Sequence, residues 1–155
     1  MIRLAFLLAL GLVAATADAA EDFARSDWPE LLVAHRGHAL VVHFWGLDCA
    51  PCLRELPNWG RFVADHAGLA VVFIETTAAP ADTVANALQA AHLNAAVQLQ
   101  LVTPFDEELW FAVDRNWQGE LPLTMLFDAD GQARALNGEV DFAALSKWSE
   151  RGHSR

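Results

Sequence analysis

Residues 41–57 read Val-Val-His-Phe-Trp-Gly-Leu-Asp-Cys-Ala-Pro-Cys-Leu-Arg-Glu-Leu-Pro, and they contain both cysteines of the chain. The run from Ala39 to Trp45 is almost entirely apolar, which is typical of a strand buried on both faces of a parallel sheet. A helix is expected over residues 50–67 because apolar side chains recur there every three to four positions, with Pro57 kinking it. Cys49 is therefore predicted at the N-terminus of a helix that follows a buried strand.

The segments around this stretch alternate between helix and strand. Helices are expected behind the cap Ser26 (with Trp28, Pro29 and Leu32 in the first turns), from Asp82 to about Leu93, from Glu107 to Asn116 behind Asp106, and from Asp141 through Trp148. Strands are expected over residues 69–76 and 97–102, and a hairpin over 123–136 around Asp128-Ala129-Asp130-Gly131. This order predicts an α/β fold with a mixed central β-sheet flanked by helices on both faces.

Length and charge exclude several classes of protein. A chain of 155 residues with 54% hydrophobic and 19% charged residues is one ordered domain with a real core. Its net charge of −10 is repelled by the phosphates of nucleic acid, so we expect no nucleic-acid partner. The same charge repels anionic lipid surfaces. Two cysteines are too few for a self-contained four-cysteine zinc site or a disulfide-dense scaffold.

The first 19 residues read as an export signal. Arg3 supplies the positive end, Leu4 to Ala15 the apolar run, and Ala17-Asp18-Ala19 the small residues before a cleavage site. We expect cleavage after Ala19, a mature domain over residues 20–155, and a location in the periplasm, an oxidising compartment. An uncleaved membrane anchor is the alternative, although the run is shorter than the roughly 20 residues that span a bilayer.

Cys49 and Cys52 are the residues with the clearest chemistry. A helix N-terminus favours an anion and lowers the pKa of a thiol, and the thiolate is the nucleophile. Cys52, one turn further on, is expected within reach of Cys49 but hidden from solvent, and Pro51 stiffens the short ring at no cost to the helix. One alternative is a purely structural disulfide, although a four-residue ring stabilises a fold by only about 2 kcal/mol. Another is half of a metal site completed by histidines, and the candidates are His35, His38 and His43.

Residues 41–57 resemble the active-site stretch of exported thioredoxin-like proteins, and the closest group is the TlpA/ResA branch of thiol–disulfide oxidoreductases. The segment 121–131 is similar to the part of that family that carries a cis-proline and a hairpin. The resemblance implies that Pro122 is cis and faces the cysteine pair, and that Leu121 before it helps to hold the substrate chain. Residues 79–102 match the helix-strand insertion of this branch. The resemblance thus implies a thioredoxin-like fold.

The same resemblance suggests roles for three residues near the cysteines. Glu55 is expected to tune the thiols and move protons, with a solvated helix acid as the alternative. His43 occupies the strand position where thioredoxins keep a buried acid, so it is either a base for Cys52 or a core histidine without a role in the chemistry. Trp45 is expected to pack beneath the active site.

Asp48 departs from the pattern, because the family usually has an aromatic residue directly before the first cysteine. A carboxylate there opposes the thiolate and is expected to raise the pKa of the Cys49 thiol.

The function implied by the resemblance is reduction of disulfides in client proteins. The clients would be cysteine-containing proteins such as apocytochrome c or a copper-site protein, and the electron donor a membrane thiol transporter of the CcdA/DsbD kind. We expect no cofactor beyond the redox-active disulfide and no resident metal. The alternatives are a Cu(I) metallochaperone that uses Cys49 and Cys52 as soft ligands, and a binding module with an idle disulfide.

Overall fold

The computed structural model describes residues 20–93 and 95–152, and the expected signal segment 1–19 lies outside them. A short 3₁₀ turn (Arg25–Asp27) precedes the first helix. The strands are β1 (Glu21–Phe23), β2 (Leu40–Trp45), β3 (Ala70–Glu75), β4 (Val97–Leu101), β5 (Leu123–Phe127) and β6 (Ala133–Asn137). The helices are α1 (Trp28–Ala34), α2 (Ala50–Asp65), α3 (Ala81–Ala90), α4 (Glu107–Val113) and α5 (Phe142–Gly152).

The strands form one mixed sheet in the order β1-β4-β3-β2-β5-β6. The first four are parallel to one another, and β5 and β6 run antiparallel as the predicted hairpin. The expected insertion is present: α3 and β4 follow β3, and β4 adds a strand between β3 and β1. The predicted fold class is therefore confirmed.

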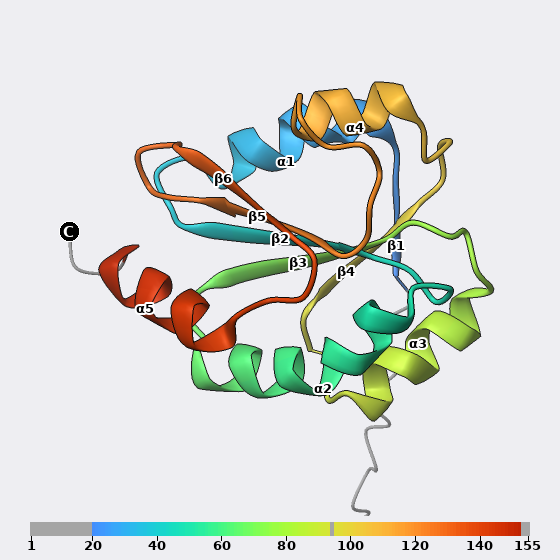
Figure 1. Ribbon diagram of the computed structural model, residues 1–155, viewed down its shortest axis with the longest axis horizontal. Coiled ribbons are helices and arrows are strands. Elements are labelled where there is room, and N and C mark those ends of the chain that lie inside the picture. Colours follow the sequence, from blue (N-terminus) through green and yellow to red (C-terminus); the bar gives the residue numbers. More distant parts are fainter. Residues whose placement is uncertain (1–19, 94, 153–155) are drawn as a thin grey trace, which may run out of the picture.

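Helices cover both faces of the sheet (Figure 1). The core on one face packs α1 and α4 against the sheet, and the core on the other packs α2, α3 and α5. Every residue of β2 is buried, as predicted, with alternate side chains entering the two cores. Val41, His43 and Trp45 point towards α2, and this alternation brings His43 to the helix that carries the second cysteine.

Two predicted helix caps are wrong. Ser26 lies inside the 3₁₀ turn, its hydroxyl donates to Asp27 Oδ1 at 3.3 Å, and Asp27 takes the N-cap position of α1. Asp82 lies in the first turn of α3, where Pro80 is the N-cap and Asp82 Oδ1 accepts from the N–H of Thr83 at 2.8 Å. Neither of the observed N-cap residues, Asp27 and Pro80, caps its helix with a side-chain hydrogen bond.

The other differences concern element ends. The edge strand β1 was not predicted, because three residues with two exposed acids carry little strand signal and depend on pairing with β4. The helix α4 ends at Val113 rather than Asn116 because Asp114 adopts an extended backbone. The helices α2 and α3 also end earlier than predicted, at Asp65 and Ala90. Among the described residues, no helix combines the length and the apolar character needed to cross a membrane.

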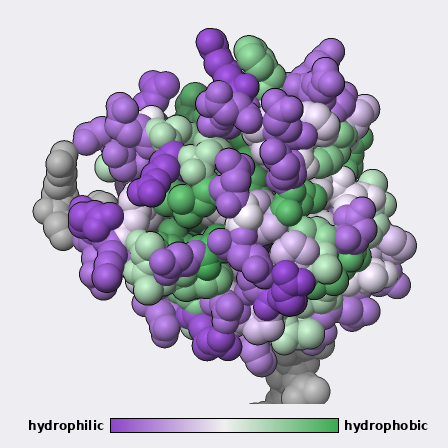
Figure 2. Space-filling model, in the orientation of Figure 1, coloured by the Kyte–Doolittle hydropathy of each residue, from purple (hydrophilic) through white to green (hydrophobic). Residues whose placement is uncertain are grey.

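Hydrophilic side chains dominate the face of the molecule in Figure 2, and the hydrophobic ones gather near its centre, where the sheet runs. This distribution agrees with a chain whose charged residues lie mainly outside two well-filled cores.

Candidate active site

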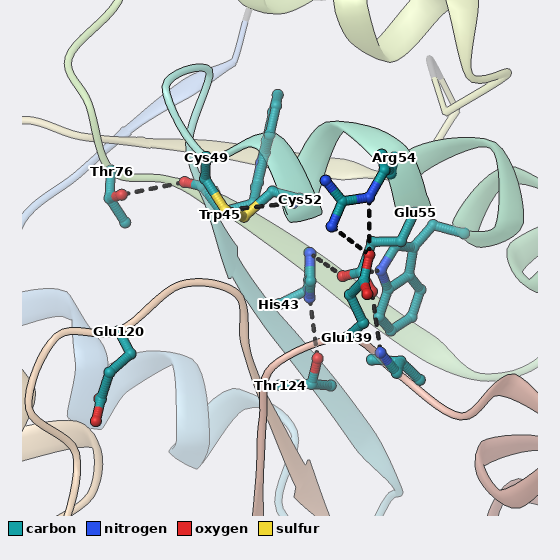
Figure 3. Close-up of a disulfide and its surroundings, with 12 residues drawn as sticks. His43, Trp45, Cys49, Cys52, Arg54, Glu55, Thr76, Glu120, Thr124 and Glu139 are labelled. Carbon is teal, nitrogen blue, oxygen red and sulfur yellow. Dashed lines mark hydrogen bonds and ion pairs between the residues drawn. A yellow bond between two sulfur atoms is a disulfide. The ribbon is translucent and has the colours of Figure 1, made fainter.

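Cys49 and Cys52 form a disulfide at the start of α2 (Figure 3). Cys49 is the N-cap of this helix, and its sulfur accepts the backbone N–H of Cys52 at 3.2 Å. Cys52 is fully buried, whereas Cys49 is partly exposed. The predicted placement and the predicted difference in accessibility are both confirmed. Once the bond is reduced, the same N–H and the helix N-terminus are placed to stabilise a Cys49 thiolate.

The segment before β5 approaches the cysteines with a cis peptide bond between Leu121 and Pro122, as expected. Pro122 is buried, and its carbonyl accepts the N–H of Gly138 at 2.9 Å. Leu121 is half-buried and shares a cavity with Cys49. The residue expected to hold a substrate chain therefore lies beside the exposed sulfur.

This cavity has a volume of about 530 Å³ and opens widely to solvent. It combines the start of α2 with the loop after β3 and the segment before β5. Its lining is Asp48, Cys49, Ala50, Pro51, Thr76, Thr77, Phe105, Gly119 and Leu121. A larger cavity of about 650 Å³ lies at the opposite end of the sheet and contains neither cysteine. The smaller cavity is the one that offers redox chemistry.

His43 lies behind the disulfide, between β5 and α2 (Figure 3). Its side chain is fully buried, and Nδ1 lies 3.0 Å from the hydroxyl of Thr124. The other ring nitrogen, Nε2, is 3.3 Å from Glu55 Oε1 but is not aligned for a hydrogen bond. His43 therefore links the strand that follows the cis-proline to an acid of the active-site helix.

Glu55 is buried, with only 3% of its surface exposed. Its Oε1 accepts the indole N–H of Trp59 at 3.2 Å, and its Oε2 accepts the backbone N–H of Val140 at 3.0 Å. The structure thus contradicts the alternative of a solvated helix acid. Arg54, next to it on α2, reaches outwards and pairs with Glu139 at 3.0 Å.

Burial moves the pKa values of both groups towards their neutral forms. Complete desolvation lowers the pKa of His43 from 6.5 to about 3. Desolvation also raises the pKa of Glu55; the N–H groups of Val140 and Trp59 oppose this rise, and the charge of Glu139 adds to it. The site therefore holds a neutral imidazole beside a carboxyl group that keeps its proton to a higher pH than usual.

Trp45 ends β2 and is fully buried in the core beneath α2, together with Cys52. Its carbonyl accepts both the N–H and the hydroxyl of Thr76, at 2.9 and 3.1 Å. The expected packing of this indole beneath the active site is confirmed.

Three solved structures with similar folds are thiol–disulfide proteins. A secreted disulfide oxidoreductase of Mycobacterium tuberculosis is 21% identical with a TM-score of 0.59, over 79% of this chain and 86% of that one. A thiol:disulfide interchange protein of the thioredoxin family from Chlorobium tepidum is 21% identical with a TM-score of 0.63, over 77% and 83%. A secreted thiol–disulfide isomerase of Corynebacterium glutamicum is 16% identical with a TM-score of 0.62, over 78% and 74%. The chain has a thioredoxin-like fold. No family model and no curated protein matches the sequence.

In this thioredoxin-like protein, the residues singled out from the sequence gather in two groups. Asp48, Cys49, Pro51 and Leu121 line the cavity, whereas His43, Trp45, Cys52, Glu55 and Pro122 are buried behind it.

Three groups that hold His43 and Glu55 in place were not predicted from the sequence: Thr124, Trp59 and the N–H of Val140. Thr124 carried a weak signal, since a polar residue two positions after the proline interrupts an apolar strand. The contact of Val140 carried no signal in the sequence, because every residue except proline has a backbone N–H.

Proposed function

We propose that the protein is an exported thiol–disulfide oxidoreductase that reduces disulfides in client proteins. The observation that carries this proposal is the disulfide itself: a partly exposed Cys49 at a helix N-terminus is joined to a buried Cys52, beside a cis-proline segment. Only one of the two sulfurs can meet a client, and that division of labour suits exchange. The export signal expected in residues 1–19 and the secreted nature of two structural relatives support a location outside the cytoplasm.

In the proposed reaction, the Cys49 thiolate attacks one sulfur of a client disulfide. A mixed disulfide forms, and the other client sulfur leaves as a thiolate. Cys52 then loses its proton and attacks the sulfur of Cys49, so the second client sulfur leaves and the Cys49–Cys52 bond forms. Two electrons have passed to the client, and the oxidised protein needs a thiol donor to restore it.

Glu55 is the group proposed to receive the proton of Cys52, and His43 is proposed to stay neutral beside it. Figure 3 shows both side chains close to the disulfide on its buried side. Burial raises the pKa of Glu55 and makes its carboxylate a stronger base than an exposed one, whereas the lowered pKa of His43, about 3, makes its imidazole a weak base. Leu121 and Pro122 are proposed to bind the client chain.

The partners follow from the family resemblance. Apocytochrome c and copper-site proteins are the proposed clients, and a membrane thiol transporter of the CcdA/DsbD kind is the proposed electron donor. The reducing direction is tested by the potential of the Cys49–Cys52 couple in glutathione buffers. A value near −270 mV supports a reductant, whereas a value near −120 mV means an oxidant.

The division of labour is tested by alkylation and trapping. We expect brief alkylation of the reduced protein to label Cys49 much faster than Cys52. Cys52→Ser is expected to accumulate mixed disulfides with a disulfide-bonded client, and the matched control Cys49→Ser is not. Equal labelling of the two cysteines, or trapping by Cys49→Ser instead, contradicts the proposal.

A further inference from the structure

One wall of the active-site cavity is built by Thr76 and Thr77, the first two residues after β3, which we call the threonine wall. Thr76 is fixed to the end of β2 through its two hydrogen bonds to the carbonyl of Trp45, one of which is drawn in Figure 3. Thr77 is held differently, by a buried side chain to which the proposed chemistry gives no role.

That side chain is Glu75, the last residue of β3, which is completely buried. Its Oε1 accepts the backbone N–H of Thr77 at 2.8 Å and also the Thr77 hydroxyl. Its Oε2 lies 3.5 Å from the amide nitrogen of Gln100, the neighbouring residue on β4. The same amide nitrogen donates to the carbonyl of Ala79 at 2.5 Å. Glu75 and Gln100 together therefore hold the loop after β3 at both of its ends.

The chemistry of the three groups requires an acceptor at position 75. A carboxylate offers only lone pairs, and here it faces an N–H, a hydroxyl and an amide NH₂. A glutamine at the same place would turn its own NH₂ towards one of these donors. Either Thr77 loses its acceptor, or Gln100 must rotate and release Ala79.

The position of Thr77 in turn affects the rest of the cavity through Gly46. A Cβ atom added at Gly46 would lie 2.6 Å from the Thr77 methyl, 3.0 Å from Asp48 Oδ1 and 3.5 Å from Leu121 Cδ1. Three side chains that line the cavity thus converge over one glycine. The carbonyl of Gly46 also accepts the N–H of Cys49 at 3.2 Å, so the threonine wall packs on the turn that carries the exposed sulfur.

We propose that Glu75 is a positioning residue that, with Gln100, holds the threonine wall in the shape that receives the peptide chain of a client. The inference rests on the proposed function and adds a determinant of client binding to it. Glu75 acts on the part of the substrate that extends along the cavity. The exchange between sulfurs depends instead on Cys49, Cys52 and the buried groups behind them.

The test compares two disulfides of different size in single-turnover reactions of the pre-reduced protein. One is bis(2-hydroxyethyl) disulfide, which is too small to reach along the wall, and the other is a disulfide-bonded decapeptide. For Glu75→Gln we expect the half-saturating peptide concentration to rise about tenfold, because a released wall must be ordered again before it binds the peptide, at a cost of about one hydrogen bond. The maximal rate with the peptide, the rate with the small disulfide and the Cys49–Cys52 potential are expected to stay unchanged.

The matched control is Ile74→Val, which removes one methylene group from the residue preceding Glu75 on β3 and lowers stability without touching the loop. It is expected to leave the kinetics with both disulfides unchanged. Gln100→Ala provides a second route to the same answer if Glu75→Gln does not fold, and it is expected to show the same selective loss with the peptide.

An equal loss with both disulfides, or a shifted potential, overturns the inference because Glu75 would then act through the sulfurs. Unchanged peptide binding in both variants overturns it as well. These outcomes are distinct from failure of the proposed function, in which the unmodified protein reduces neither disulfide.

Discussion

Asp48 stands directly before Cys49, and its exposed carboxylate lines the same cavity. The helix N-terminus favours a Cys49 thiolate, and this like charge opposes it. In a Cys52→Ser background, we expect Asp48→Asn to lower the pKa of the Cys49 thiol. At a given pH, the thiolate fraction of Cys49 is expected to rise by less than about tenfold. The ultraviolet absorbance of the thiolate, followed against pH, measures this change.

Added salt is expected to shrink the effect of Asp48→Asn, because screening weakens interactions between exposed charges. Asp65→Asn provides the control, since it removes another exposed charge, at the far end of α2. If the two variants have the same thiol pKa at low salt, Asp48 has no local effect on the thiol, which contradicts the prediction.

His43 makes stability depend on pH. In the unfolded chain His43 binds a proton below about pH 6.5. In the folded protein it stays neutral until its pKa of about 3 is reached. The free energy of unfolding therefore falls as the pH drops, by about 2 kcal/mol between pH 7 and 5 from this group. Glu55 acts in the opposite sense, because its raised pKa lets the folded state bind a proton first.

Replacing His43 with asparagine isolates its contribution. We expect His43→Asn to lose less stability than the unmodified protein between pH 7 and 5 in urea titrations, by about 2 kcal/mol. A variant that instead loses more stability would mean that His43 is charged in the folded state and paired with an ionised Glu55.

At the scale of elements, Glu55 joins α2 to the connection between β6 and α5. Glu55→Ala leaves the buried indole N–H of Trp59 and the partly buried N–H of Val140 without their acceptor, and we expect a loss of about 2–4 kcal/mol in urea unfolding. Glu55→Gln keeps one acceptor oxygen and is expected to cost less. Arg54→Ala removes only an exposed ion pair, and a loss above about 0.5 kcal/mol there would contradict this ranking.

Elements whose sequences carry strong local patterns could be predicted well. The apolar run of β2 and the Asp-Gly turn between β5 and β6 placed these strands within a residue or two. The start of α2 at Ala50 was predicted as well, and with it the N-cap position of Cys49. The strand β1 was not predicted, because its pairing with β4 joins residues far apart in the chain.

The candidate site also contains features that could be predicted from the sequence and features that could not. The CxxC spacing revealed the disulfide, and the family resemblance placed the cis-proline. The contacts of His43 with Thr124 and of Glu55 with Val140 join residues 81 and 85 positions apart. Only the tertiary packing of β5 on β2, and of the β6–α5 connection on α2, creates these contacts, so no local pattern could predict them.

For the molecule as a whole, the disulfide closes a loop of only four residues, whereas the fold rests on two cores and a six-stranded sheet. We expect reduction to lower the free energy of unfolding by about 2 kcal/mol without unfolding the protein. Thermal denaturation of the oxidised and reduced forms measures the difference. The double variant Cys49→Ser/Cys52→Ser is expected to match the reduced form, and a reduced protein that is unfolded at 25 °C would contradict the estimate.

The ion pair between Arg54 and Glu139 makes a buried group sensitive to the salt in the medium. Both side chains are more than half exposed, so dissolved ions weaken their attraction, with a screening length of about 8 Å at physiological ionic strength. Glu139 also acts on the buried Glu55 through its charge, and its neighbour Val140 bonds to the same carboxylate. A change in the ionic strength of the medium therefore alters the proton affinity of Glu55, although its carboxyl group is almost completely buried. The proton affinity of the group behind the disulfide thus depends on the salt outside the protein as well as on the fold.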